Sequence, residues 1–173
     1  MSTEPSRARA VNAADTGNTG GILNAGDAED AGGARDIGDA GDAVNAADPA
    51  CRSLGIAVEE VAAGRARLRM RISEDMLNGH GIAHGGYLFL LADAAFAYAS
   101  NAHGPVTLAQ SAQVTFLRPA AAGDELVAEA AERVRYGRHG VYDVTVRRPA
   151  GEVVAEFRGQ SVMVSGRPGG TSR

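Results

Sequence analysis

The segment from Gly85 to Ala99 limits the possible folds of this chain strongly, because it is almost entirely small and apolar. Its one charged residue is Asp93. A helix that is apolar on all sides has to be covered on most of its circumference. A carboxylate inside it needs partners or a shifted pKa. We therefore expect a buried helix from about Gly85 to Asn101, with a polar site near Asp93.

A glycine-rich polar loop leads into this helix, with the order Asn78-Gly79-His80-Gly81-Ile82-Ala83-His84-Gly85-Gly86. The start of a helix offers unpaired backbone N–H groups and the positive end of the helix dipole. Glycines at 85 and 86 would let a substrate approach that backbone closely. The pattern suggests that an oxyanion is stabilised there. The alternative is that both glycines only allow tight helix packing.

The rest of the ordered region is typical of strands. Arg65 to Ile72 alternates between apolar and arginine residues, which predicts a sheet with one solvent-exposed face. A short helix should begin at Asp48-Pro49, with Asp48 as its N-cap. The other strands are expected at 56–61, 106–117, 124–135, 141–147 and 153–164, with a turn at 136–140.

The order of these elements is strand, strand, long apolar helix, then four strands. A strongly curved antiparallel sheet wrapped around one long central helix would cover the helix on most sides. The predicted fold class is therefore α+β, with the architecture of the hotdog fold.

The two ends of the chain differ in composition. The first fifty residues contain nine acidic residues and three arginines and lack aromatic residues. The net charge of this segment is therefore more negative than the −4 of the whole chain, and the remaining residues are mildly basic. We expect residues 1–46 to be a disordered Ala/Gly/Asp-rich tail, residues 47–165 to form the domain, and residues 166–173 to be flexible. No stretch is typical of a signal peptide or a membrane span, which favours a cytoplasmic location. A single cysteine, Cys51, excludes an internal disulfide and a cysteine-built zinc site.

Several short motifs follow one another along the chain. They are Asp48-Pro49-Ala50, Leu54-Gly55-Ile56, Met76-Leu77-Asn78-Gly79-His80-Gly81, His84-Gly85-Gly86, Leu91-Ala92-Asp93-Ala94-Ala95-Phe96-Ala97, Phe116-Leu117-Arg118-Pro119-Ala120, Gly123-Asp124-Glu125-Leu126-Val127-Ala128-Glu129-Ala130 and Phe157-Arg158-Gly159. In this order and spacing they resemble the hotdog acyl-CoA thioesterases of the phenylacetate-degradation (PaaI) type. The resemblance covers roughly residues 46–165.

The resemblance implies a set of catalytic residues. Asp93 would act as general base for water or as a nucleophile, and the Gly85 amide would bind the oxyanion. Asn78 would bind the thioester carbonyl or the water, and His84 would orient the thioester sulfur. Ser111, in a strand expected to face the helix, would hold the water. Each of these four residues also has a purely structural interpretation. Asp93 could be a buried acid that bonds to the backbone or to an arginine, and Asn78 could form a turn by bonding to its own backbone. His84 could cap the loop, and Ser111 could simply fill space in the strand.

The offset between Gly85 and Asp93 predicts a homodimer. Eight residues of helix separate them by roughly 12 Å, so one carbonyl cannot reach both within one helix. Two antiparallel helices related by a two-fold axis would bring Gly85 of one chain near Asp93 of the other. The resemblance agrees with sites between subunits, and a homotetramer is expected.

The expected substrate is an aryl or medium-chain acyl-CoA. No cofactor beyond the CoA of the substrate, no metal, no nucleic acid and no membrane is expected.

Three arginines near the predicted turn, Arg133, Arg135 and Arg138, are candidates for binding the CoA phosphates. The alternative is a solvated strand face.

Two other functions stay open. One is a non-catalytic acyl-CoA-binding module on the same fold. The other is an enoyl-CoA hydratase, suggested only by the spacing of Asp75 and His80.

Overall fold

The computed structural model describes residues 48–165, so the predictions for 1–46 and 166–173 lie outside the described residues. The elements follow the predicted order. They are α2 (Pro49–Ser53), β1 (Ala57–Ala62), β2 (Arg65–Arg71), the 3₁₀ helix η1 (Glu74–Met76), α3 (Gly85–Asn101), β3 (Thr107–Phe116), β4 (Glu125–Tyr136), β5 (His139–Arg147) and β6 (Val153–Met163).

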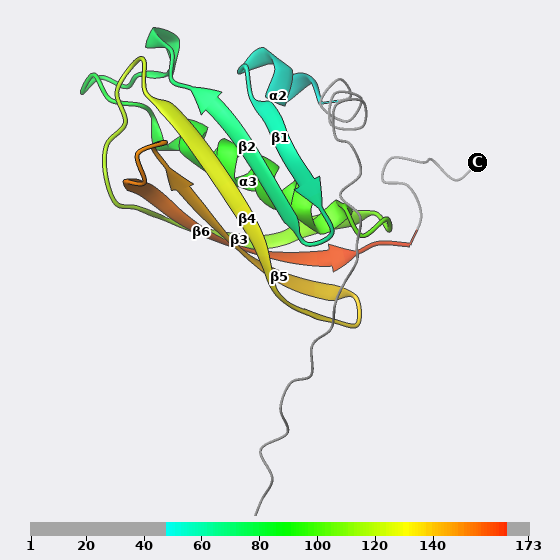
Figure 1. The fold of residues 1–173 in the computed structure, drawn as a ribbon. Coiled ribbons are helices and arrows are strands. Elements are labelled where there is room, and N and C mark those ends of the chain that lie inside the picture. Colours follow the sequence, from blue (N-terminus) through cyan, green and yellow to red (C-terminus); the bar gives the residue numbers. More distant parts are fainter. Residues whose placement is uncertain (1–47, 166–173) are drawn as a thin grey trace, which may run out of the picture. The chain divides into compact units, whose positions relative to one another are not determined.

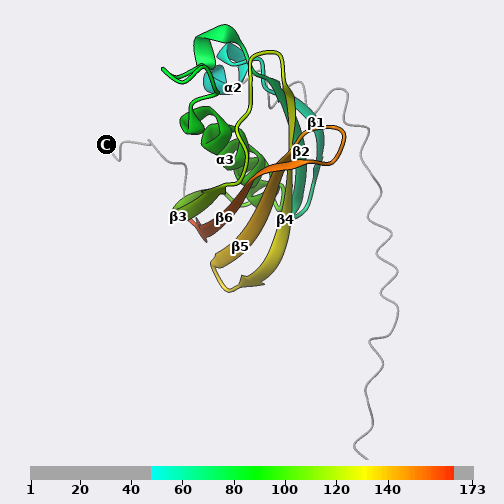
Figure 2. The ribbon, with the colours of Figure 1, turned by 90° about the vertical axis from the view of Figure 1, so that its left-hand side faces the viewer.

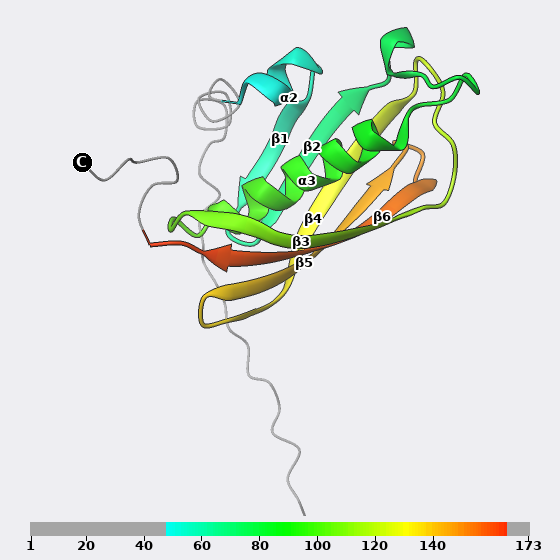
Figure 3. The same cartoon turned by 180° about the vertical axis from the view of Figure 1, so that it is seen from behind.

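The strands form one antiparallel sheet in the order β1-β2-β4-β5-β6-β3. Figure 1 shows the sheet in front of α3, and Figure 3 shows the helix lying diagonally across the other face. In Figure 2 the sheet curves around α3. The predicted hotdog architecture is confirmed, and Asp48 caps α2 by accepting from the N–H groups of Ala50 and Cys51.

One predicted turn is too long. The sequence suggested a turn over residues 136–140, but Tyr136 pairs with His139 across the β4–β5 hairpin. Only two residues therefore connect the strands. Gly137 has a φ of 56°, a conformation that glycine adopts at little cost and that suits a two-residue hairpin.

The core lies between α3 and the concave face of the sheet. Leu91, Ala95 and Phe96 of the helix are fully buried, and Phe96 packs against Tyr142 and Phe157 with ring centroids 5.4 and 5.9 Å apart. As predicted, α3 is covered on most of its circumference, although not on all sides. A stripe of the helix surface is not covered by the sheet, because a one-layer sheet reaches only part of a helix circumference. Its members are Gly86, Leu90, Asp93, Ala94 and Ala97.

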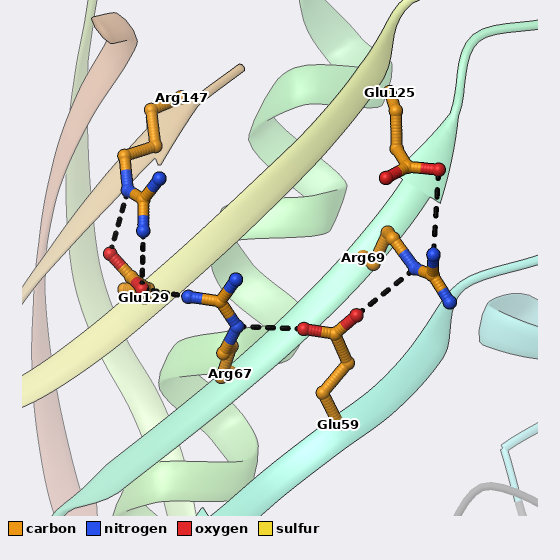
Figure 4. A network of polar contacts seen from close by, with 6 residues as sticks. All are labelled: Glu59, Arg67, Arg69, Glu125, Glu129 and Arg147. Carbon is orange, nitrogen blue, oxygen red and sulfur yellow. Dashed lines mark hydrogen bonds and ion pairs between the residues drawn. The ribbon is translucent and has the colours of Figure 1, made fainter. Parts of the chain in front are cut away.

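The alternation predicted for β2 is confirmed. Ala66, Leu68 and Met70 are buried, whereas the arginines between them lie on the convex face. These arginines are neutralised by carboxylates of neighbouring strands (Figure 4). The chain of contacts runs from β1 to β5 through Arg69–Glu125, Arg69–Glu59, Arg67–Glu59, Arg67–Glu129 and Arg147–Glu129. The row is thus a paired, solvated face rather than a free cationic surface.

Among residues 48–165, no helix has the length and apolarity that crossing a membrane requires.

Candidate functional site

An open pocket of about 830 Å³ lies at the N-terminal end of α3. Four of the predicted site residues line it: Asn78, His84, Gly85 and Gly86. The remaining wall is mainly apolar and comes from α3, from the end of β3 and from the segments that flank them. These residues are Ile82, Ala83, Leu88, Phe89, Val114, Phe116, Leu117, Arg118, Pro119 and Ala120. A few polar groups around an apolar cavity are typical of a small-molecule site.

Asn78 begins a tight turn, as the structural alternative suggested. Its Oδ1 accepts from the His80 N–H at 2.9 Å, and its own N–H donates to the Ile82 carbonyl at 2.8 Å. Because Oδ1 is the acceptor in this bond, the Nδ2 amide group is the part of the side chain left to interact with a ligand. Asn78 therefore combines a turn with a hydrogen-bond donor at the pocket.

His84 is the N-cap of α3. Its Nδ1 accepts from the Gly86 N–H at 3.4 Å, a long contact, while its backbone N–H donates to the Met76 carbonyl at 2.8 Å. Since Nδ1 is an acceptor here, the proton of the neutral ring is on Nε2. The imidazole of His84 thus offers an N–H donor on the side away from the helix.

Gly85 occupies the first position of α3. Within residues 48–165 its backbone N–H has no acceptor, as expected for the first turn of a helix. The glycine is also needed for packing, because a Cβ at this position would lie 2.9 Å from Cζ of Phe116. At Gly86 a Cβ would meet only His84 Nδ1, at an ordinary 3.7 Å. The alternative of tight packing therefore applies to Gly85 and not to Gly86.

Asp93 does not line the pocket of its own chain. It is half-buried on the uncovered stripe of α3, two turns beyond Gly85, and burial raises the pKa of its carboxyl group above the ordinary value. In the described part of the chain, no hydrogen bond or ion pair compensates this carboxylate, and burial is the only cause of its pKa shift. The structural alternative of a paired, buried acid therefore lacks support within residues 48–165.

Ser111 does not face α3 of its own chain. It is exposed and pairs with Gln160, whereas the next residue, Ala112, pairs with Gly159 under the ring of Phe96. Side chains alternate along a strand, so Ser111 points away from α3. The expectation that it faces the helix fails because the register shift between Ala109 and Ser111 changes the alternation.

The three candidate arginines are not equivalent. Arg133 forms an ion pair with Asp143 at 3.3 Å, and the Arg138 guanidinium donates to the Met163 carbonyl at 2.8 and 3.0 Å. Arg135 has no partner among the described residues and lines a small cavity near the C-terminal end of α3. Only Arg135 is therefore free to bind an anion without breaking a contact within residues 48–165.

Other candidates are placed outside the pocket. Asp75 and His80 are exposed and do not line it. Burial, followed by the hydrogen bond to Asp48, raises the pKa of the Cys51 thiol to about 12, so this cysteine is a poor nucleophile. In the part of the chain that the structure describes, no three His, Cys, Asp or Glu side chains gather as metal ligands would.

Two features were missed in the sequence. Phe116 and Leu117 were treated only as part of a motif, although each is about half exposed and lines the pocket. An apolar pair at the end of a strand is ordinarily assigned to the core, so no local signal marks it. A polar cluster at the other end of α3 was also missed, because it joins residues remote in sequence. There Glu132 Oε2 accepts from the Tyr142 hydroxyl at 2.8 Å and contacts His103 Nε2 at 2.6 Å.

The comparisons with known proteins identify related chains. A model of the thioesterase superfamily matches residues 80–155. The acyl-coenzyme A thioesterase PaaI of Escherichia coli (strain K12) is 42% identical over 119 residues, which cover 69% of this chain and 85% of that protein.

Solved structures agree with this similarity. The structure of the E. coli PaaI protein from the phenylacetic acid degradation operon has a TM-score of 0.70 at 41% identity and covers 72% of this chain and 91% of its own. The TT0310 protein from Thermus thermophilus has a TM-score of 0.65 at 40% identity, with 68% and 98% covered.

Proposed function

The chain belongs to the PaaI-type acyl-CoA thioesterases of the thioesterase superfamily, and we propose that it hydrolyses the thioester bond of an acyl-CoA to the free acid and CoA. The observation that carries the proposal is the Gly85 N–H, which has no acceptor among residues 48–165 at the start of α3. Gly85 lines an apolar pocket that Asn78 and His84 also line. The reaction uses water and needs no cofactor or metal.

The Gly85 amide would bind the oxyanion. Charge develops on the thioester oxygen when water attacks, and a helix N-terminus with a fixed N–H stabilises that charge without reorganisation. The Asn78 Nδ2 group would donate a second hydrogen bond to the carbonyl or hold the water. The His84 Nε2–H would orient the thioester sulfur. All three groups line one pocket, which supports their assignment to one substrate.

Asp93 would activate the water. As a general base it takes a proton from water while the oxygen attacks the carbonyl carbon; the C–S bond then breaks and the departing thiolate takes up a proton. As a nucleophile it would form a mixed anhydride with release of CoA, and water would hydrolyse the anhydride. Its raised pKa makes the carboxylate a stronger base than an exposed aspartate. Both routes require the ionised form.

The active unit would be a homodimer with two shared sites. Gly85 and Asp93 lie on one helix, separated by roughly 12 Å along its axis. The stripe of α3 that carries Asp93 is uncovered in the single chain. A second copy, related by a two-fold axis, would cover this stripe and bring its Asp93 to the Gly85 amide.

The edge strand β3 favours the same arrangement. It has ten residues without a charged residue or proline and has only β6 as a neighbour. The opposite edge, β1, is shorter and carries Glu59 and Glu60. Edges that stay unpaired are usually blunted in these ways, so β3 is the edge suited to pairing with a second copy. The homotetramer and the cytoplasmic location stay predictions.

Arg135 would bind a phosphate of CoA. It lines a cavity with His103 near the C-terminal end of α3, far from the pocket of its own chain. Antiparallel helices would place this end beside the partner's pocket, where the long CoA moiety leaves the site. Arg133 and Arg138 are weaker candidates because contacts within the chain already engage them.

The test is release of free thiol from a panel of acyl-CoAs, with sedimentation of each protein. We expect the wild type to turn over and to sediment as a dimer or larger. Asp93→Ala should abolish turnover, whereas His80→Ala, outside the pocket, should not change it. Tight binding without turnover by the wild type would instead indicate an acyl-CoA-binding module. A fully active monomer would contradict the shared site.

A further inference from the structure

We propose that Phe116 selects the acyl group at the carbon next to the thioester carbonyl, so that unbranched acyl groups are hydrolysed and groups branched at this carbon are rejected. The inference rests on the proposed thioesterase function and on the Gly85 amide as the site of the carbonyl oxygen.

The position of the Phe116 ring over Gly85 is the first observation. A Cβ at Gly85 would lie 2.9 Å from Cζ of Phe116 and 3.2 Å from both neighbouring ring carbons, so the face of the ring at Cζ covers the helix start. The ring lines the pocket, yet 51% of the residue is exposed. It can therefore contact both the Gly85 backbone and a ligand bound there.

The backbone around Phe116 is held by β6. Phe116 pairs with Ala155 of β6, and the Leu117 N–H donates to the Val154 carbonyl at 2.8 Å. The Arg118 guanidinium donates to the Val153 carbonyl at 2.7 Å. Because these contacts fix the end of β3, the ring can leave Gly85 only by changing its rotamer.

The ring lies beside the first carbon of a bound acyl group. A carbonyl oxygen on the Gly85 N–H would sit about 2.9 Å from the nitrogen. The carbon next to the carbonyl is two bonds beyond this oxygen and would therefore lie within a few ångströms of the Gly85 backbone, which the ring covers. A hydrogen on this carbon fits beside the ring, whereas a methyl group needs the space that the ring occupies.

The deeper pocket does not impose the same restriction. Leu88, Phe89 and Val114 line the pocket as well, and none of them is in contact with Gly85 in the way that Phe116 is. Phe89 is held by Phe157 in an edge-on contact, with ring centroids 5.4 Å apart, and forms a fixed wall. Discrimination by Phe116 should therefore concern branching at the first carbon and not the length of the chain.

Two isomers of equal composition test this inference, butyryl-CoA and isobutyryl-CoA. The kcat/KM for each is measured by thiol release for the wild type, Phe116→Leu and Phe116→Ala. Since one methylene is worth roughly 10- to 200-fold in a tight pocket, the wild type should prefer butyryl-CoA by at least about tenfold. Phe116→Ala should bring the two values close together, and Phe116→Leu should lie between.

A matched control is Tyr136→Ala, which removes an exposed aromatic ring at the β4–β5 hairpin, outside the pocket. It should keep the wild-type ratio. The proposal would be overturned if Phe116→Ala kept the wild-type ratio of the two kcat/KM values, including the case in which both values fall equally. It would also be overturned if Tyr136→Ala changed this ratio as much as Phe116→Ala does.

Binding separates this inference from the proposed function. The ketone analogues of the two substrates, in which a methylene replaces the thioester sulfur, keep the carbonyl and cannot be hydrolysed. Their dissociation constants should show the same preference for the unbranched chain in the wild type and its loss in Phe116→Ala. A wild type that lacks turnover but shows this pattern would refute the hydrolysis and retain the selection by Phe116. Equal binding of both analogues by the wild type would refute the selection.

Discussion

Gly85 and Phe116 are in direct contact, so a side chain at position 85 would have to displace the Phe116 ring. The contact joins the first turn of α3 to the end of the edge strand β3. Gly85 therefore has a packing role in addition to the proposed binding of the oxyanion by its N–H. A loss of activity on substitution would not by itself separate the two roles.

The first prediction separates them. Gly85→Ala should destabilise the protein by about 0.5–1.5 kcal/mol, because the new methyl group would force the half-exposed Phe116 ring off its rotamer. In the Phe116→Ala background the same substitution should cost far less free energy of unfolding, since the overlap is gone. Chemical denaturation measures each step of this double-mutant cycle.

Gly86→Ala is the matched control, because a Cβ there would make only an ordinary contact with His84. It should change stability far less than Gly85→Ala. If Gly85→Ala were as stable as its parent in both backgrounds, the packing role of Gly85 would be excluded.

The second prediction concerns the stability cost of Asp93. Burial raises its pKa, so the fold disfavours the ionised form, and this cost appears as the pH rises from the unfolded pKa through the folded pKa. Asp93→Asn should therefore melt at a higher temperature than the wild type at pH 7, with loss of thiol release. The difference should shrink as the pH falls toward the ordinary value of 3.8. A lower melting temperature at pH 7 would argue that Asp93 has a stabilising partner.

The third prediction concerns the pH dependence of turnover. Both proposed routes require the Asp93 carboxylate, whose pKa is raised from 3.8 by burial. In the wild type, kcat/KM should fall on the acid side with a midpoint above that value. Thiol release measured across acidic pH, together with circular dichroism to show that the protein stays folded, provides the check. A midpoint at or below 3.8 would contradict the raised pKa of the free enzyme.

The fourth prediction concerns the dimer. Ala97 is exposed on the uncovered stripe of α3, so Ala97→Glu should place a charge in the proposed interface. We expect dissociation in sedimentation experiments and a parallel loss of activity. Ala131→Glu is the control, since Ala131 is exposed on the convex face of β4. A dimer that survives Ala97→Glu would show that the subunits meet elsewhere.

The fifth prediction concerns the polar cluster at the far end of α3. Burial alone would raise the pKa of Glu132, but hydrogen bonds from Tyr142 and His103 outweigh it and lower the pKa. Tyr142→Phe keeps the ring and removes one bond to a carboxylate, which should cost about 1.5–3 kcal/mol in denaturation experiments at pH 7.

The stability difference between wild type and Tyr142→Phe should depend on pH, and the lowered pKa of Glu132 fixes the direction. This stabilisation is present above the unfolded pKa and is lost as the pH falls through the folded pKa. The difference between wild type and Tyr142→Phe should therefore decrease in acid. A difference independent of pH would show that the hydroxyl acts without the carboxylate.

Local sequence patterns were enough to predict the elements and the fold class. They are the alternation of arginine and apolar residues in β2, the unbroken apolar run of α3 and the cap at Asp48. Such patterns record which side of an element meets the core, so they predict its type and approximate bounds. The order of the motifs also identified the family and four residues of one pocket, because these four follow each other closely in the chain.

Contacts between distant residues, by contrast, became known only from the folded chain. The placement of the Phe116 ring on Gly85, the turning of Ser111 away from α3 and the separation of Arg135 from Arg133 depend on strand register and on bulges. The uncovered stripe that exposes Asp93 depends on how far the sheet reaches around the helix. These relations join residues far apart in the sequence, and no local periodicity encodes them.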